Sequence, residues 1–284
     1  MYSTAPRNEG KHFRVYMTTS EEFRSKIYNF YRTHRRDLPW RDTADPYRIM
    51  VSEIMLQQTQ VERVKEKYSI FLEQFPDVES LGRATTEEVL AAWQGLGYNR
   101  RALALKKAAG EIVERFGGIL PDNEKSLRSL PGIGPYTAAA ILTFAFNQPV
   151  VMIETNIRRV FIHCFFKDQT GVADRDILPL IEETLDRENP REWYNALMDY
   201  GFYVGTTIEN PNRRSRHYQR QSPFEGSNRQ IRGKILRLLV GGGDTAIEEL
   251  SRDLDLPLSS ISPVIRQLED EGFISREGNL VRIA

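Results

Sequence analysis

The stretch Leu130-Pro-Gly-Ile-Gly134 lies between two segments of helical periodicity, residues 123–129 and 135–146. Gly132 and Gly134 permit positive φ and leave the backbone amides unobstructed. These amides and the start of the following helix can hold one phosphate group without a charged side chain. The stretch therefore predicts a helical hairpin that grips a nucleic-acid backbone regardless of base sequence. The alternative is a glycine-rich turn that binds nothing.

Helical periodicity continues on both sides of this hairpin, with no convincing strand pattern between the helices. Helices are expected at residues 21–34, 45–60, 61–74, 86–93, 99–116, 123–129, 135–146, 154–166, 175–186 and 192–205. This pattern predicts a mostly α fold of about ten helices joined by short loops.

The last part of the chain has a different pattern. Helices are predicted at 229–240, 246–254 and 259–271, the second opened by a capping box of Thr245 and Glu248. A hairpin signal follows them at 273–283, and three helices before a hairpin are typical of a winged helix. The segment from 228 to 284 has 8 basic and 9 acidic residues, which makes it a poor autonomous DNA binder.

The overall composition excludes several classes of protein. The 284 residues include 39 Lys+Arg and 39 Asp+Glu, so binding of nucleic acid by bulk charge is not expected, although a local basic face is. A single cysteine, Cys164, excludes an intramolecular disulfide and any site held by four cysteines of this chain. Neither a signal peptide nor a transmembrane stretch is recognisable, so the chain is expected to be intracellular, in the cytoplasm or associated with the nucleoid.

Two glutamates stand in apolar sequence surroundings. Glu53 lies within Ile49–Leu56, and Glu154 follows Val150–Ile153. A carboxyl group in apolar surroundings has a raised pKa and can act as a general acid, while a second, ionised one can stabilise an oxocarbenium-like sugar. The alternative is a structural role, and Glu154 in particular resembles the start of a helix, where an acid is favoured anyway.

Two further features suggest contact with DNA. Gln58 and Tyr98 stand at the ends of predicted elements, where they can enter a duplex and fill the gap left by an extruded base; ordinary capping and packing is the alternative. Residues 210–234 contain seven basic residues against Glu225 alone, a concentration that favours nucleic-acid contact.

Several motifs occur in one order along residues 21–205. They are Leu38-Pro-Trp-Arg41, Pro46-Tyr47, Ser52-Glu-Ile-Met-Leu-Gln-Gln-Thr-Gln-Val61, Gly95-Leu-Gly-Tyr98, Leu130-Pro-Gly-Ile-Gly134 and Asn156-Ile-Arg-Arg-Val160. Together they resemble the helix-hairpin-helix (HhH-GPD) DNA glycosylase superfamily and, within it, the MutY-type adenine-DNA glycosylases.

The resemblance implies a two-lobed fold and assigns roles to individual residues. Glu53 matches the general acid that protonates the departing adenine, and Glu154 matches the catalytic aspartate that stabilises the sugar cation. Asn156 matches an asparagine that orients the same centre. Tyr136 stands where bifunctional relatives carry a Schiff-base lysine, which implies a monofunctional enzyme without an efficient lyase step. The implied DNA-binding residues are Gln58, Leu96, Tyr98, Leu130, Gly132, Gly134, Arg213, Arg214, Arg216 and Arg220.

The sequence departs from the family at three places. Glutamate replaces aspartate at position 154, which lengthens the side chain by one methylene. Residues 206–219 contain no cysteine where four are expected, so neither an iron–sulfur cluster nor another cofactor or metal is predicted, and this basic loop is expected to contact phosphates. A winged helix stands where the Nudix-like domain that reads 8-oxoguanine is expected.

These observations predict three regions: an N-terminal tail at 1–20, a glycosylase domain at 21–224 and a winged helix at 225–284. The glycosylase domain is expected to have one lobe at about 47–150 and another built from 21–46 and 151–224. The expected function is excision of adenine opposite guanine or 8-oxoguanine from double-stranded DNA by a monomer, with the winged helix available to a protein partner. A mismatch thymine or uracil glycosylase and a non-catalytic DNA-binding regulator remain as alternatives.

Overall fold

A computed structural model describes residues 19–219 and 225–284 and divides them into two compact units. One unit comprises the described residues up to Arg36 together with Val151–Gln219. The other comprises Asp37–Val150 together with the described residues after 224. The expected mostly α fold is confirmed, with a small sheet near the C-terminus.

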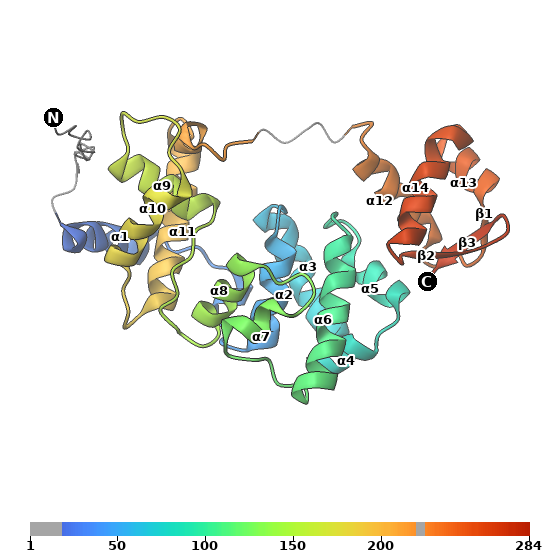
Figure 1. Cartoon of the computed structure of the whole chain (residues 1–284), viewed down its shortest axis with the longest axis horizontal. Coiled ribbons are helices and arrows are strands. Elements are labelled where there is room, and N and C mark those ends of the chain that lie inside the picture. Colours follow the sequence, from blue (N-terminus) through green and yellow to red (C-terminus); the bar gives the residue numbers. More distant parts are fainter. Residues whose placement is uncertain (1–18, 220–224) are drawn as a thin grey trace, which may run out of the picture. The chain divides into compact units, whose positions relative to one another are not determined.

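The first unit consists of four main helices (Figure 1). These are α1 (Ser20–His34), α9 (Thr155–Phe165), α10 (Asp174–Thr184) and α11 (Pro190–Thr207), followed by the short 3-10 helix η2 (Pro211–Arg214). Helix α11 packs against both α9 and α1. Phe23 of α1 is fully buried among rings of the other helices, 5.3 Å from Phe161 and 5.8 Å from Trp193 between ring centroids.

The second unit contains a helical lobe that carries the hairpin. The lobe begins with the 3-10 helix η1 (Pro39–Arg41) and continues with α2 (Pro46–Leu56), α3 (Val61–Gln74), α4 (Val78–Arg83), α5 (Thr86–Trp93), α6 (Arg100–Phe116), α7 (Glu124–Arg128) and α8 (Pro135–Phe144). Helix α2 is buried on most of its surface and packs against α3, α6 and α8. The residues of α2 are therefore fixed by the core of this lobe.

The same unit includes the C-terminal domain, which we define as residues 228–284. Its helices are α12 (Asn228–Leu239), α13 (Ile247–Leu254) and α14 (Leu258–Asp270), and its strands are β1 (Thr245–Ala246), β2 (Ile274–Glu277) and β3 (Leu280–Ile283). The strands form an antiparallel sheet in the order β1-β3-β2, with Ile274 opposite Ile283. The expected helices and hairpin are present, and the designation winged helix stays a prediction.

Three local expectations are wrong. The helix expected to run to about Gln60 ends at Leu56, because Gln57 leaves the helical region and Gln58 has a φ of 55°. The six-residue helix α4 was not expected, although a capping box of Asp77 and Ser80 marks its start. Thr245 does not cap α13: it lies in β1, and its hydroxyl donates to the carbonyl oxygen of Gly243.

The three tryptophans and the single cysteine of the chain are buried. Trp93 and Trp193 are fully buried, Trp40 is nearly so, and Cys164 is a buried free thiol. Within residues 19–219 and 225–284, no helix combines the length and the apolar character that crossing a bilayer requires.

Candidate active site and nucleic-acid interface

Glu53 lies on the buried helix α2, whose start is fixed by two residues. The side chain of Asp45 accepts a hydrogen bond from the amide of Arg48, and Pro46 occupies the first helical position. Glu53 is 7% exposed and its neighbour Ile54 is 1% exposed. The carboxyl group therefore has the apolar setting expected from the sequence, and this setting suits a general acid.

The hairpin turn between α7 and α8 presents both of its glycines to solvent. Gly132 has a φ of 77°, and a Cβ atom there would lie 2.8 Å from the Cβ of Ala104, so glycine is required at this position. Gly134 has a φ of −84°, which every residue can adopt, so only Gly132 uses the positive φ that glycine permits. Leu130 is 3% exposed, so the expectation that it contacts DNA does not fit its burial.

Tyr136 stands in the first turn of α8, directly after Pro135. Its neighbour Thr137 accepts a hydrogen bond from the Gln57 side-chain amide at 3.1 Å. This bond joins the first turn of α8 to the loop that follows α2. The structure therefore brings the hairpin, Tyr136 and the Gln57–Gln60 segment together in one unit.

Arg101 connects two loops of this lobe. Its Nη1 donates to the carbonyl oxygens of Ile54 and Met55, both at 2.8 Å, and to that of Gln57 at 2.5 Å. Its Nη2 donates to Thr59 Oγ1 at 2.8 Å and to the carbonyl oxygen of Gly97 at 3.0 Å. Arg101 is 9% exposed, and burial lowers the pKa of its guanidinium to about 10.

Sequence reasoning did not single out Arg101. The available signal was an arginine directly before the apolar run Ala102–Leu105 of an amphipathic helix, a position that α6 buries. A buried arginine needs several acceptors, and loop carbonyls that lack helical partners supply them.

The two loops that Arg101 joins carry Gln58 and Tyr98. Both residues have positive φ, 55° for Gln58 and 48° for Tyr98. Gln58 is exposed and Tyr98 is half-buried. Leu96, in contrast, is 3% exposed, so the expectation that its side chain contacts DNA does not fit the structure. Gln58 and Tyr98 remain candidates for insertion into a duplex.

Glu154 is the N-cap of α9 in the other unit, which confirms its expected place at a helix start. Its Oε1 accepts hydrogen bonds from the amides of Asn156 at 2.7 Å and Ile157 at 2.8 Å. Burial raises the pKa of the Glu154 carboxyl, whereas the two amide hydrogen bonds and the guanidinium groups of Arg159 and Arg158 lower it; the net shift is upward. These bonds hold the carboxyl group against the first turn of α9.

Asn156 is held by Arg159, one helical turn further along α9. Arg159 Nη1 donates to Asn156 Oδ1 and to the carbonyl oxygen of Gly201, both at 2.8 Å, and its Nε donates to Asn210 Oδ1 at 3.2 Å. A Cβ atom on Gly201 would overlap the backbone of Asn156, and one on Gly205 would overlap the Arg159 guanidinium. The two glycines of α11 therefore allow this close approach to α9.

The loop after α11 is tied to α9 by side chains. The Asn212 amide group donates to the carbonyl oxygen of Thr155 at 2.9 Å, at the start of α9. The Arg214 guanidinium donates to the carbonyl oxygens of Phe166 and Lys167, at the end of α9. The amide of Arg216 donates to the carbonyl oxygen of Val172 at 2.9 Å. The 3-10 helix η2 is thus hydrogen-bonded to both ends of α9.

The residues of this loop do not fit an iron–sulfur cluster. Cluster irons are held by cysteine thiolates, and the one cysteine of the chain, Cys164, is buried within α9. Amide and guanidinium groups stand in the loop and make hydrogen bonds. In the described part of the chain, no group of three or more His, Cys, Asp or Glu residues has an arrangement that can hold a metal ion.

The four arginines expected to contact DNA differ in their surroundings. Arg213 and Arg216 are exposed, and Arg213 pairs with Glu209 at 2.9 Å. Arg214 is half-buried and donates to α9 carbonyls, so its role as a phosphate ligand does not fit these contacts. Arg220 lies outside the described residues.

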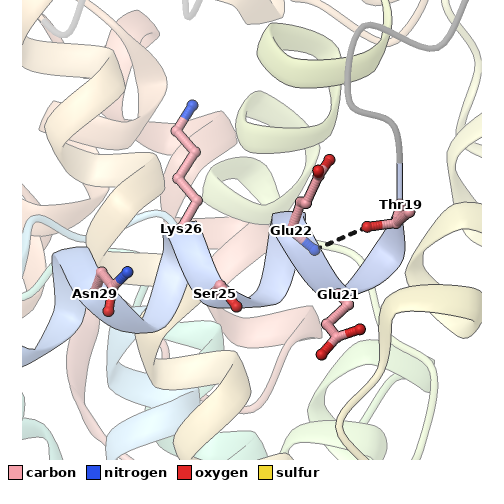
Figure 2. A pocket seen from close by; sticks show the side chains of 6 residues that line it. All are labelled: Thr19, Glu21, Glu22, Ser25, Lys26 and Asn29. Carbon is pink, nitrogen blue, oxygen red and sulfur yellow. Dashed lines mark hydrogen bonds between the residues drawn. The ribbon is translucent and has the colours of Figure 1, made fainter.

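A shallow hollow lies along α1, on the face shown in Figure 2. Its lining residues are Thr19, Glu21, Glu22, Ser25, Lys26 and Asn29. Thr19 Oγ1 accepts a hydrogen bond from the Glu22 amide at 3.1 Å, which caps the helix. None of the predicted site residues lines this hollow, and we assign it no function.

Comparison with known proteins identifies the family. Residues 51–179 match the HhH-GPD superfamily of base excision DNA repair proteins. The adenine DNA glycosylase of Mycolicibacterium smegmatis is 33% identical, over 75% of this chain and 79% of the relative. The chain belongs to the adenine DNA glycosylase family. The mouse adenine DNA glycosylase is 34% identical over 85% of this chain, but the chain spans only 48% of that relative's length.

Solved structures agree with this membership. A thermostable thymine-DNA glycosylase superimposes with a TM-score of 0.60 at 29% identity, covering 68% of this chain and 90% of that one. An endonuclease III–DNA complex superimposes with a TM-score of 0.51 at 19% identity, covering 73% and 92% of the two chains, and shows a shared fold. The expected fold class is confirmed.

Proposed function

We propose that this protein is a monofunctional base-excision DNA glycosylase that hydrolyses the N-glycosidic bond of adenine opposite guanine or 8-oxoguanine. The observation that carries the proposal is Glu53, a carboxyl group 7% exposed on a buried helix of a chain from the adenine DNA glycosylase family. A protonated carboxyl in such a place can deliver its proton to the leaving base.

Glu154 and Asn156 supply the second half of the proposed chemistry. As the base departs, the sugar develops positive charge, and an ionised carboxylate stabilises it. Glu154 is fixed by two backbone amides, and Asn156 is fixed by Arg159, so both groups are oriented before substrate arrives. We propose that Glu154 stabilises this charge and that Glu53 supplies the proton.

The residue next to the hairpin is a tyrosine and not a lysine, and this determines the product that we expect. A lysine amine can attack the sugar and form an imine, which leads to strand cleavage. Tyr136 stands at this position and cannot form an imine. We therefore propose that water completes the reaction and that the product is an intact strand with an abasic site.

Binding to double-stranded DNA is proposed to use the exposed amides at Gly132 and Gly134 together with Arg213 and Arg216. Gln58 and Tyr98, which Arg101 holds on adjacent loops, are proposed to fill the space left by the extruded base. No iron–sulfur cluster is required in this scheme, since η2 is tied to α9 by side chains. The protein is proposed to act as a monomer.

The test is a single-turnover assay on duplexes that each carry one A:G, A:8-oxoG, T:G or U:G mispair. Alkali cleaves abasic sites, so we expect alkali-dependent cleavage of the adenine strand and its loss in Glu53→Gln. Cleavage without alkali would contradict a monofunctional enzyme. Absence of cleavage on every duplex would favour the non-catalytic DNA-binding regulator.

A mismatch thymine or uracil glycosylase is the second candidate. The observation that favours it is the superposition on a thymine-DNA glycosylase, with 90% of that chain covered. Preferential cleavage of the T:G or U:G duplex would support this candidate over adenine excision.

A further inference from the structure

The carboxylate of Glu271 is shared by two arginines from different parts of the second unit. Arg100, the first residue of α6, binds it with two hydrogen bonds of 2.8 and 2.5 Å. Arg232 of α12 binds it with two bonds of 3.2 and 2.6 Å. Glu271 follows α14 directly, so the pair with Arg100 joins the C-terminal domain to the helical lobe.

A second contact joins the C-terminal domain to the loop before α6. Arg229 Nη1 donates to the Tyr98 hydroxyl at 2.7 Å. The Arg229 guanidinium lies 5.7 Å from the centroid of the Tyr98 ring, and that of Arg101 lies 5.5 Å from it. Tyr98 is therefore held by one arginine of its own lobe and by one arginine of the C-terminal domain.

Bidentate geometry favours the contact. Glu271 is 19% exposed and Arg232 of the same domain is 14% exposed, whereas Arg100 of the lobe is 65% exposed, and both guanidinium groups bind the one carboxylate bidentately. In addition, the amide of Gly241 donates to Glu87 Oε1 at 2.7 Å. The C-terminal domain has no net positive charge for binding DNA alone, so its contacts with the lobe are its best-supported role.

The loop that carries Tyr98 needs such support. Gly95, Gly97 and Tyr98 all have positive φ, at 94°, 69° and 48°. A left-handed conformation is unfavourable for a residue with a side chain, so without external contacts Tyr98 would favour other conformations. A hydrogen bond from a charged donor such as Arg229 offsets this cost.

We propose that the C-terminal domain is a clamp that fixes Tyr98 for insertion into DNA, with Glu271 and Arg229 as positioning residues. The proposal rests on the proposed function for the role of Tyr98. In the clamp, Glu271 holds Arg100 at the start of α6, next to the loop, and Arg229 holds the phenol itself. Neither residue is proposed to touch the reacting nucleotide.

The first experiment does not depend on enzymatic activity. Amide hydrogen exchange is measured in the free full-length protein at Leu96 and Arg101, whose amides donate to the carbonyl oxygens of Trp93 and Tyr98. We expect exchange at least tenfold faster in Glu271→Gln and in Arg229→Met. The matched control is Arg282→Gln, which breaks an exposed pair with Asp244 inside the C-terminal domain and leaves the loop unchanged. Wild-type exchange in both clamp variants would overturn the proposal.

The second experiment asks whether Glu271 acts through Tyr98. Single-turnover excision is measured on the A:8-oxoG duplex for wild type, Glu271→Gln, Tyr98→Ala and the double variant. We expect Glu271→Gln to lower the rate at least fivefold alone and to have no further effect when Tyr98 is absent. Full additivity of the two losses would overturn the clamp. An inactive wild type would contradict the proposed function instead, and the exchange result would still decide whether the clamp exists.

Discussion

Arginines hold the loops of the two units in different ways. In the helical lobe, Arg101 is 9% exposed and donates to six backbone carbonyls and one hydroxyl around the end of α2 and the segment before α6. In the other unit, Arg159 and Arg214 are half-buried and connect the segment after α11 to α9. Both arrangements supply hydrogen-bond donors to backbone carbonyls, but only that of Arg101 lies within a core.

This difference in burial predicts how each loop responds when its arginine is replaced. Removing a buried donor leaves several acceptors unsatisfied, whereas a half-buried group is partly replaced by water. The loops of Gln58 and Tyr98 should therefore depend on the global stability of their lobe. The loop of Asn210 and Asn212 should loosen locally, with its main effect on the orientation of Glu154 and Asn156.

The largest expected effect is that of Arg101→Met on stability. The substitution keeps an unbranched apolar stem but leaves the carbonyls of Ile54, Met55 and Gln57 without their donor, at a cost of about 3–5 kcal/mol in the free energy of unfolding. Urea denaturation monitored by circular dichroism measures it. The matched control is Arg128→Met, an exposed i,i+4 pair with Glu124, which we expect to change stability by about 0.5 kcal/mol or less. Equal effects of the two substitutions would remove the distinction between a core arginine and a surface one.

A smaller effect is expected for Arg159→Met in the other unit. Loss of the bonds to Asn156 and to the carbonyl of Gly201 should cost about 2 kcal/mol and lower the rate of excision. The comparison variant is Arg187→Met, which removes an exposed pair with Glu182 and should alter neither quantity measurably. If Arg159→Met retained the full excision rate, Asn156 would not depend on Arg159 for its orientation.

The pH dependence of excision tests the effect of Arg159 on Glu154. The positive charge of Arg159 lowers the pKa of the Glu154 carboxyl against the larger effect of burial. If the ionised form is the active one, excision rises with pH as this group deprotonates. Removing the charge raises the pKa further, so the acid limb of the rate profile of Arg159→Met should lie at higher pH than that of wild type. Superimposable acid limbs would show that Glu154 does not control this limb.

The sequence predicted what depends on local pattern. The periodicity of residues 61–74 and 86–93 reproduces α3 and α5, and the glycines after Leu130 predicted the hairpin. The end of α2 was not predictable from the local sequence. The carbonyls of Ile54, Met55 and Gln57 accept hydrogen bonds from Arg101, which lies more than 40 residues away in the chain. Composition alone cannot reveal that distant partner.

In the basic segment, too, the sequence pattern and the packing lead to different conclusions about neighbouring residues. Arg213, Arg214 and Arg216 are alike in sequence, and together they indicated a surface for phosphates. Only Arg214 donates to carbonyl oxygens at the end of α9, those of Phe166 and Lys167. Packing of η2 on α9, which the sequence pattern does not encode, decides which of the three arginines stays available.

The smallest expected effects concern the two glycines of the hairpin. Gly132→Ala places a Cβ atom 2.8 Å from that of Ala104 and forces a left-handed conformation on alanine, at a cost of about 1–2 kcal/mol.

Gly134→Ala meets nothing within 4 Å and has an ordinary φ, so we expect it to fold with wild-type stability. Gly134→Ala then serves as a probe of function alone: a methyl group on the exposed turn obstructs a phosphate without loosening the hairpin. Electrophoretic mobility shifts on a duplex should show weaker binding for Gly134→Ala at unchanged melting temperature, because the amides proposed to hold the phosphate are partly covered. Wild-type affinity in this variant would place the phosphate contact elsewhere on the protein.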